Sequence, residues 1–178
     1  MGGERKALIV ANDEYEHEAL RRLMAPSADA RALARVLGDR NIGGFSVDSV
    51  LNKPAHDVEA RIEDLFADSQ PDDLLLLHFS CHGLKSEAGE LFFAARNTRP
   101  DRLGSTAIAA DFIQRCIKSC RARSIVLFLD CCYGGAFGQG VRACLWLGQR
   151  VGKLPGRQAR RRQGSRRDHR VQLDGVCL

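Results

Sequence analysis

Two short motifs in this sequence carry the residue types that nucleophilic catalysis requires. Ser80-Cys81-His82-Gly83 follows one long apolar run, and Asp130-Cys131-Cys132 follows another. A thiolate attacks a carbonyl carbon efficiently when an imidazole is close and backbone N–H groups stabilise the oxyanion that forms. Gly83 lacks a side chain and would let a substrate backbone approach closely. His82 and Cys132 are therefore the candidate imidazole and the candidate nucleophile.

The elements around the two motifs predict a parallel sheet covered on both faces, because apolar runs alternate with amphipathic segments. Strands are expected at 6–12, 45–51, 72–80 and 124–130, with helices at 27–37, 55–66 and 107–120 and a short strand, half of a hairpin, at 90–96. Functional residues of such sheets gather outside the carboxyl ends of the strands, where both motifs lie. If the strands at 72–80 and 124–130 are neighbours, His82 and Cys132 open onto the same cleft.

Composition and charge exclude several classes of protein. The chain has 178 residues with 44% hydrophobic and 28% charged residues, which is typical of one soluble globular domain. No apolar run approaches the roughly 20 residues of a membrane span, and the start lacks a signal peptide's apolar stretch, so a cytoplasmic protein without a membrane partner is expected. Seven cysteines, an odd number, and no CxxC pair argue against a disulfide framework and against a structural zinc site.

The positive charge lies in the last part of the chain. From Arg142 onward, ten Arg and Lys face only two Asp, whereas residues 1–141 carry a net charge of −3. The alternation of strands and helices also stops there, which predicts a domain at 1–141 and a basic, disordered tail at 142–178. Nucleic acid is not an expected partner, because no aromatic or folded recognition motif accompanies the arginines.

Taken together, the two motifs resemble the caspase family and its relatives, the metacaspases. The caspase histidine lies about 50 residues before the cysteine, and His82 precedes Cys132 by 50. One strand ending in S-x-H-G and another ending in D-x-C-x-x-G are most similar to metacaspases and bacterial caspase-like proteins. The resemblance covers residues 5–141. It implies a three-layer α/β fold with a mostly parallel sheet flanked by helices, and a cysteine endopeptidase acting on polypeptides.

The resemblance also implies the role of each site residue. Cys132 is the nucleophile, and Cys131 replaces a small residue before it. The backbone N–H groups of Gly83 and Cys132 donate to the oxyanion. Asp29 and Asp130 match the acidic residues with which metacaspases bind Arg or Lys at P1, the substrate residue before the cleaved bond. Metacaspases often require Ca²⁺, but the sequence identifies no site for it and indicates no other cofactor.

Simpler interpretations of these residues stay open. The Cys131-Cys132 pair could fill the core, as buried free cysteines commonly do. His78, inside an apolar strand, fits a core or wall histidine whose hydrogen bonds are satisfied. Asp130 could cap a following helix, and Asp29 could be an ordinary exposed carboxylate in the first turn of a helix.

The segment after the cysteine departs from the family pattern. Caspase-like domains continue well past it with further strands, whereas 46 residues follow Cys132 here and they do not look like strands. We therefore expect the C-terminal strands to be missing from a truncated or frameshifted product, with the sheet edge beside the strand at 124–130 either exposed or covered only by the tail. The alternative function is a catalytically weak or inactive remnant that acts as an interaction module. The sequence indicates no oligomeric state.

Overall fold

The computed structural model describes residues 3–131 and the backbone of residues 142–148. Its main sheet has five strands in the order β2-β1-β3-β7-β8. The four parallel strands are β1 (Arg5–Ala11), β2 (Ser46–Leu51), β3 (Leu74–Ser80) and β7 (Ser124–Asp130). These bounds lie within two residues of the predicted ones at each end, so the parallel sheet is confirmed.

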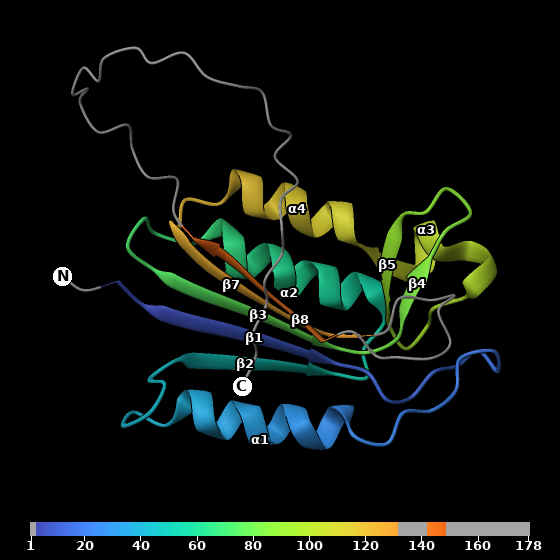
Figure 1. Ribbon diagram of the computed structural model, residues 1–178, viewed down its shortest axis with the longest axis horizontal. Coiled ribbons are helices and arrows are strands. Elements are labelled where there is room, and N and C mark those ends of the chain that lie inside the picture. Colours follow the sequence, from blue (N-terminus) through green and yellow to red (C-terminus); the bar gives the residue numbers. More distant parts are fainter. Residues whose placement is uncertain (1–2, 132–141, 149–178) are drawn as a thin grey trace, which may run out of the picture.

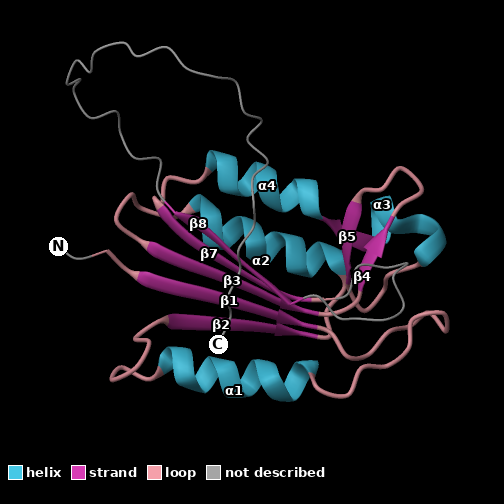
Figure 2. Cartoon of the chain, viewed as in Figure 1, coloured by secondary structure: helices cyan, strands magenta, loops and turns pink. Residues whose placement is uncertain are grey.

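Helices cover both faces of this sheet, as Figures 1 and 2 show: α1 (Pro26–Gly38) lies on one side, and α2 (Ala55–Ala67) and α4 (Ala110–Ser119) lie on the other. The strands alternate between the two faces. Leu75, Leu77 and Phe79 point toward α2 and α4 in the larger core, whereas Ile9 and Ala11 pack with Ala30 of α1 in a smaller one. The fold therefore has the three expected layers, and none of the described helices is long and apolar enough to cross a membrane.

A second, antiparallel sheet lies at the end of the main sheet where the parallel strands finish (Figure 1). Its strands are β4 (Gly83–Lys85), β5 (Leu91–Ala94) and β6 (Ala107–Ala109), in that order. β4 and β5 form the expected hairpin. Between β5 and β6 lie the short helices η1 (Pro100–Arg102) and α3 (Leu103–Thr106). Because β4 begins at Gly83, this sheet starts directly after His82.

The prediction of one helix over 107–120 is wrong at its beginning. Residues 107–109 form β6, which pairs with β5 through Ile108 and Phe93, and α4 begins only at Ala110. Ile108 is 1% exposed and belongs to the larger core, but as a strand residue rather than as part of the helix stripe. Pairing with an existing strand outweighed the helical propensity of a short Ala-rich segment, because tertiary context overrides weak propensities.

The prediction that no strand follows residue 141 is also wrong. Residues 142–148 form β8 (Arg142–Gly148), which pairs antiparallel with β7 from Ser124↔Gly148 to Asp130↔Arg142. The segment contains Leu, Trp and Cys, and these apolar residues suit a strand better than the arginine-rich sequence that surrounds them. The edge of β7 is therefore covered by part of the predicted tail, which is one of the two outcomes expected for it. The rest of the predicted tail, 149–178, lies outside the described residues.

Candidate active site

The two catalytic motifs leave the sheet from neighbouring strands. β3 and β7 pair in parallel along their whole length, with Ser80 opposite Asp130. His82 follows Ser80 by two residues and Cys132 follows Asp130 by two, so the chain leads both toward the same end of the sheet. Cys132 itself lies outside the described residues. The structure thus confirms that the two strands are neighbours and describes the surroundings of His82.

Three contacts hold His82 in place. Its Nε2 is 2.7 Å from the backbone oxygen of Arg21, its backbone N–H donates to the Tyr15 hydroxyl at 3.1 Å, and the two rings are 4.9 Å apart between centroids. A carbonyl oxygen can only accept a hydrogen bond, so Nε2 carries the proton in this arrangement. Nδ1 of the neutral ring is then the nitrogen that can accept a proton, which an imidazole partner of a thiol must do.

Tyr15 fixes the loop that supplies these contacts. Its hydroxyl donates to the backbone oxygen of Asn12 at 2.8 Å while accepting from His82, and the Asn12 N–H donates to the backbone oxygen of Ser80 at 2.9 Å. Burial is the main cause that raises the pKa of Tyr15. The hydroxyl therefore stays protonated at neutral pH and keeps both hydrogen bonds, which tie the end of β1 to the end of β3.

Asn52, just after β2, anchors the start of the same loop. Its φ of 52° is left-handed, a conformation that Asn tolerates better than most residues. There its side-chain oxygen accepts the backbone N–H groups of Asp13 at 2.9 Å and Glu14 at 3.1 Å, and its side-chain nitrogen donates to the Asp13 carboxylate at 2.6 Å. Burial acts to raise the pKa of Asp13, but hydrogen bonds from Ser27 and Asn52 together outweigh burial. The pKa of Asp13 is therefore below its ordinary value, and the carboxylate stays charged at neutral pH.

Sequence reasoning missed Tyr15 and Arg21. Tyr15 lies three residues beyond the predicted first strand, and a tyrosine after a strand carries no functional signal of its own. Arg21 contributes a backbone carbonyl, which every residue has, so no residue type could have marked it. Only the path of the loop brings this oxygen to His82.

Asp29 and Asp130 lie near one buried imidazole. Asp29 is exposed in the first turn of α1, and Asp130 ends β7 in a half-buried position. Both carboxylates act on His78 electrostatically and favour its charged form. Asp130 lies opposite Ser80 at the end of the strand next to β3, and Asp29 lies in the first turn of α1.

His78 is buried as predicted, but its hydrogen bonds are not all satisfied. The side chain is 9% exposed, with Ile9 of β1 and Phe128 of β7 as its neighbours in register. Its Nδ1 is buried without a hydrogen-bond partner in the part of the chain that the structure describes. Burial lowers the pKa of His78 and outweighs the opposite effects of Asp130 and Asp29. The imidazole is therefore neutral at neutral pH.

Because of His78, the stability of the protein should fall in mild acid. The unfolded chain binds a proton at the ordinary histidine pKa of 6.5, whereas folded His78 binds it only at lower pH, so this contribution to stability is present above pH 6.5 and is lost as the pH falls through the folded pKa. Urea unfolding between pH 7.5 and pH 5 should show a slope of up to about 1.4 kcal/mol per pH unit from this group. His78→Phe should flatten the profile, and equal profiles would contradict the expectation.

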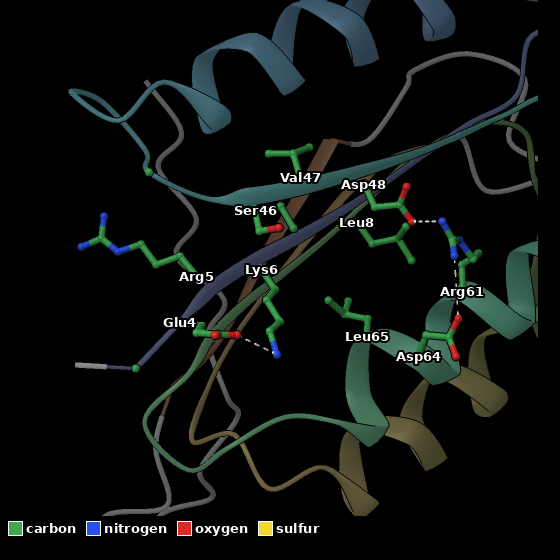
Figure 3. A pocket seen from close by; sticks show the side chains of 13 residues that line it. Glu4, Arg5, Lys6, Leu8, Ser46, Val47, Asp48, Arg61, Asp64 and Leu65 are labelled. Carbon is green, nitrogen blue, oxygen red and sulfur yellow. Dashed lines mark ion pairs between the residues drawn. The ribbon is translucent and has the colours of Figure 1, made fainter. Parts of the chain in front are cut away.

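A cavity of about 690 Å³ lies at the opposite end of the sheet (Figure 3). It is lined by the first residues of β1 and β2 and by α2. Two of the cations that line it have carboxylate partners: Lys6 lies 3.0 Å from Glu4, and Arg61 lies 2.8 Å from Asp48. The third, Arg5, donates to the backbone oxygen of Gly43 at 2.8 Å. A second cavity of about 300 Å³ lies beside it, between β2 and α2. Neither touches His82, and within residues 3–131 no cluster of three potential ligands that could hold a metal ion occurs.

The fold and the site define a three-layer α/β protein with a histidine and a cysteine-bearing motif on adjacent strand ends. The chain belongs to the caspase-domain family, whose model matches residues 4–172. This match extends beyond the segment 5–141 over which the motifs alone carry the resemblance. No curated protein sequence matches the chain.

Two solved structures share the fold. A protein from Geobacter sulfurreducens superposes with a TM-score of 0.61 at 18% identity, covering 75% of this chain and 52% of that one. Caspase-1 from Spodoptera frugiperda gives a TM-score of 0.57 at 17% identity, covering 74% of this chain and 49% of that one. The chain thus spans about half the length of each structure. At these identities the likeness establishes the caspase-like fold alone.

Proposed function

We propose that the chain is a cysteine endopeptidase that uses Cys132 as nucleophile and His82 as its imidazole partner. The observation that carries the proposal is the orientation of His82, whose Nε2 donates to the backbone oxygen of Arg21. This hydrogen bond leaves Nδ1 as the basic nitrogen, at the end of the sheet toward which β7 leads.

The proposed reaction needs four groups. The Cys132 thiolate attacks the carbonyl carbon of the peptide, and the backbone N–H groups of Gly83 and Cys132 donate to the resulting oxyanion. His82 accepts the thiol proton of Cys132 on Nδ1, and the resulting imidazolium delivers that proton to the leaving amine as the carbon–nitrogen bond breaks, which leaves an acyl-enzyme thioester. Water, deprotonated by the now neutral imidazole, then hydrolyses the thioester and restores the thiol.

The preferred P1 residue is proposed to be Arg or Lys. Asp29 and Asp130 both act electrostatically on His78, and a pair of carboxylates suits a cation and repels an acidic residue. A guanidinium can pair with carboxylates through parallel charge-assisted hydrogen bonds. A P1 aspartate would face two like charges there.

Peptides with Arg, Lys or Asp at P1 test this proposal. We expect cleavage after Arg and Lys, and Asp130→Asn should lower kcat/KM for the Arg peptide by about 10²-fold, since a hydrogen bond to a charged group contributes on the order of 1.5–3 kcal/mol. Asp64→Asn, an exposed carboxylate of α2 on the other face of the sheet, is the matched control and should have no effect. Cleavage after Asp, or an unchanged Arg rate in Asp130→Asn, would contradict the basic preference.

The alternative is a catalytically weak or inactive caspase-fold module that binds a partner protein. One observation favours this alternative: His82 lines neither the cavity of about 690 Å³ nor the cavity of about 300 Å³. The same peptides separate the two functions: absence of cleavage for all three, with and without Ca²⁺, would support the module and exclude the peptidase.

A further inference from the structure

Tyr15 contacts His82 in two ways at once. Its hydroxyl accepts the backbone N–H of His82 at 3.1 Å, and its ring lies 4.9 Å from the imidazole between centroids, tilted by 41°. Contacts between rings at such a separation are attractive and favour particular orientations. One residue therefore restrains both the backbone of His82 and the orientation of its ring.

Tyr15 is itself fixed at its hydroxyl and in the chain beside it. The hydroxyl donates to the backbone oxygen of Asn12 at 2.8 Å, and the Asn12 N–H donates to the backbone oxygen of Ser80 at 2.9 Å. On the other side of Tyr15, the N–H of Glu16 donates to the backbone oxygen of Arg96 at 2.9 Å. The phenol is thus attached to the ends of β1, β3 and β5, so it can support His82 from a defined place.

The loop that carries Tyr15 also supplies the acceptor for the imidazole. Leu23 N–H donates to the backbone oxygen of Asp13 at 3.1 Å, which closes the loop on the outer sides of Tyr15 and Arg21. A half turn of the His82 ring would break the bond between Nε2 and the Arg21 oxygen and move Nδ1 to the other side of the ring. The tilted contact with Tyr15 hinders that half turn. The place of Nδ1 therefore depends on Tyr15 as well as on the Arg21 oxygen.

We propose that Tyr15 is a positioning residue for the reaction: it fixes the orientation of the His82 ring, and with it the place of the nitrogen that accepts the Cys132 thiol proton. The proposal rests on the proposed function. Tyr15 acts through His82 and exchanges no proton itself, because its own proton is donated to the Asn12 oxygen. Misplacement of a catalytic group by about 1 Å can cost about 10²-fold in rate. Loss of Tyr15 should therefore slow the chemical step more than it weakens substrate binding.

Steady-state cleavage of an Arg-P1 peptide by the full-length chain measures this effect. Tyr15→Phe keeps the ring and removes the hydroxyl, so kcat should fall about tenfold and KM should stay within about twofold. Tyr15→Leu also removes the ring contact, and its kcat should fall about 10²-fold. In both variants the Ala94 N–H can still donate to the His82 oxygen, at 2.8 Å in the wild type, so the start of β4 should keep its path.

Ser69→Ala is the matched control for the loss of a hydroxyl. Ser69 is 0% exposed and donates to the backbone oxygen of Phe66 at 2.8 Å, the same distance as the bond from Tyr15 to Asn12. It lies between α2 and β3, at the end of the sheet where β3 begins. Its kcat should equal that of the wild type, because its hydroxyl has no connection to His82.

Combination with His82→Ala distinguishes positioning of the ring from a general effect on the fold. Residues that act as a unit are not additive in their effects on rate. Once the imidazole is absent, Tyr15→Phe should therefore cause no further loss in the residual rate of His82→Ala. A further loss of about tenfold in the double variant, equal to the loss in the wild-type background, would overturn the proposal.

Nitrogen NMR of the His82 ring gives a readout that needs no activity, with its signals assigned by their absence in His82→Ala. In mildly alkaline buffer, where imidazoles are uncharged, the wild type and Ser69→Ala should show a proton on Nε2 alone. Tyr15→Leu should show both tautomers in exchange. A single Nε2-protonated form in Tyr15→Leu, or a wild-type kcat in that variant, would overturn the role of Tyr15 and leave the peptidase intact. If the wild type cleaves no peptide, the proposed function fails and the positioning role fails with it.

Discussion

Cys132→Ala is expected to lower the rate of Arg-peptide cleavage by at least about 10³-fold, whereas Cys131→Ala is expected to retain activity within a few-fold. Loss of a covalent nucleophile removes the reaction path itself, and in serine peptidases the corresponding loss reaches about 10⁶-fold. The neighbouring thiol provides a control of the same residue type, one position away in the chain.

The burial of Cys131 supports the expectation that it does not compete as nucleophile. Cys131 is 7% exposed and belongs to the larger core, packed on the α2 and α4 side of the sheet. Buried thiols in apolar surroundings resist ionisation, and only the thiolate is a good nucleophile. Cys81 shows the same effect, because burial raises its pKa well above the ordinary value and the nearby Cys131 adds to the rise.

The measurement is steady-state hydrolysis of an Arg-P1 peptide by the two purified variants, with thermal unfolding to confirm that both are folded. An alkylating reagent with an Arg recognition element should label the wild type and Cys131→Ala but not Cys132→Ala. Equal losses in both variants, with both folded, would argue against Cys132 as the single nucleophile.

His82→Ala should lower kcat by about 10³-fold with a smaller effect on KM, because general acid–base catalysis by a positioned histidine contributes about 10²–10⁴-fold. The substitution removes the ring that donates to the Arg21 oxygen and packs on Tyr15. It leaves the backbone hydrogen bond between His82 and Tyr15 available, so the local strand path should survive.

His56→Ala is the matched control for this second experiment, since His56 is an exposed histidine at the start of α2. Its kcat should equal that of the wild type. Free imidazole in the buffer should partly restore His82→Ala, as a small base can occupy the space that the ring left. A His82→Ala variant with wild-type kcat would remove the histidine from the mechanism.

The parallel sheet could be predicted well from the sequence because its strands are short runs of mostly apolar residues. The run Leu74–Ser80 is almost wholly buried and Ser124–Asp130 is partly buried, and their apolar character depends little on the rest of the fold. The strand at 107–109 and the strand at 142–148 were missed because each depends on a partner strand that a local pattern does not reveal. Pairing over long sequence separations is a property of the whole fold.

The candidate site was predictable to a similar extent. His82 could be recognised from its residue type and its distance from a cysteine, and the structure adds its support by Tyr15 and the Arg21 oxygen. Neither support has a signal in the residue order, since one is a backbone atom and the other a single aromatic residue in a loop. The unpaired Nδ1 of His78 likewise follows from packing between neighbouring strands and could not be read from residue types.

The hydrogen bond from His82 to Arg21 has a consequence for how this site tolerates change. Because the acceptor is a backbone oxygen, a scan of side chains at position 21 would find nothing, although the oxygen there orients the ring. The length and course of the loop between Ala11 and Pro26 determine where that oxygen lies, together with its attachments to Asn52 and Tyr15. Adding or deleting one residue in this loop should therefore disturb the imidazole more than any substitution at position 21, so the site is encoded there by loop length and not by residue identity.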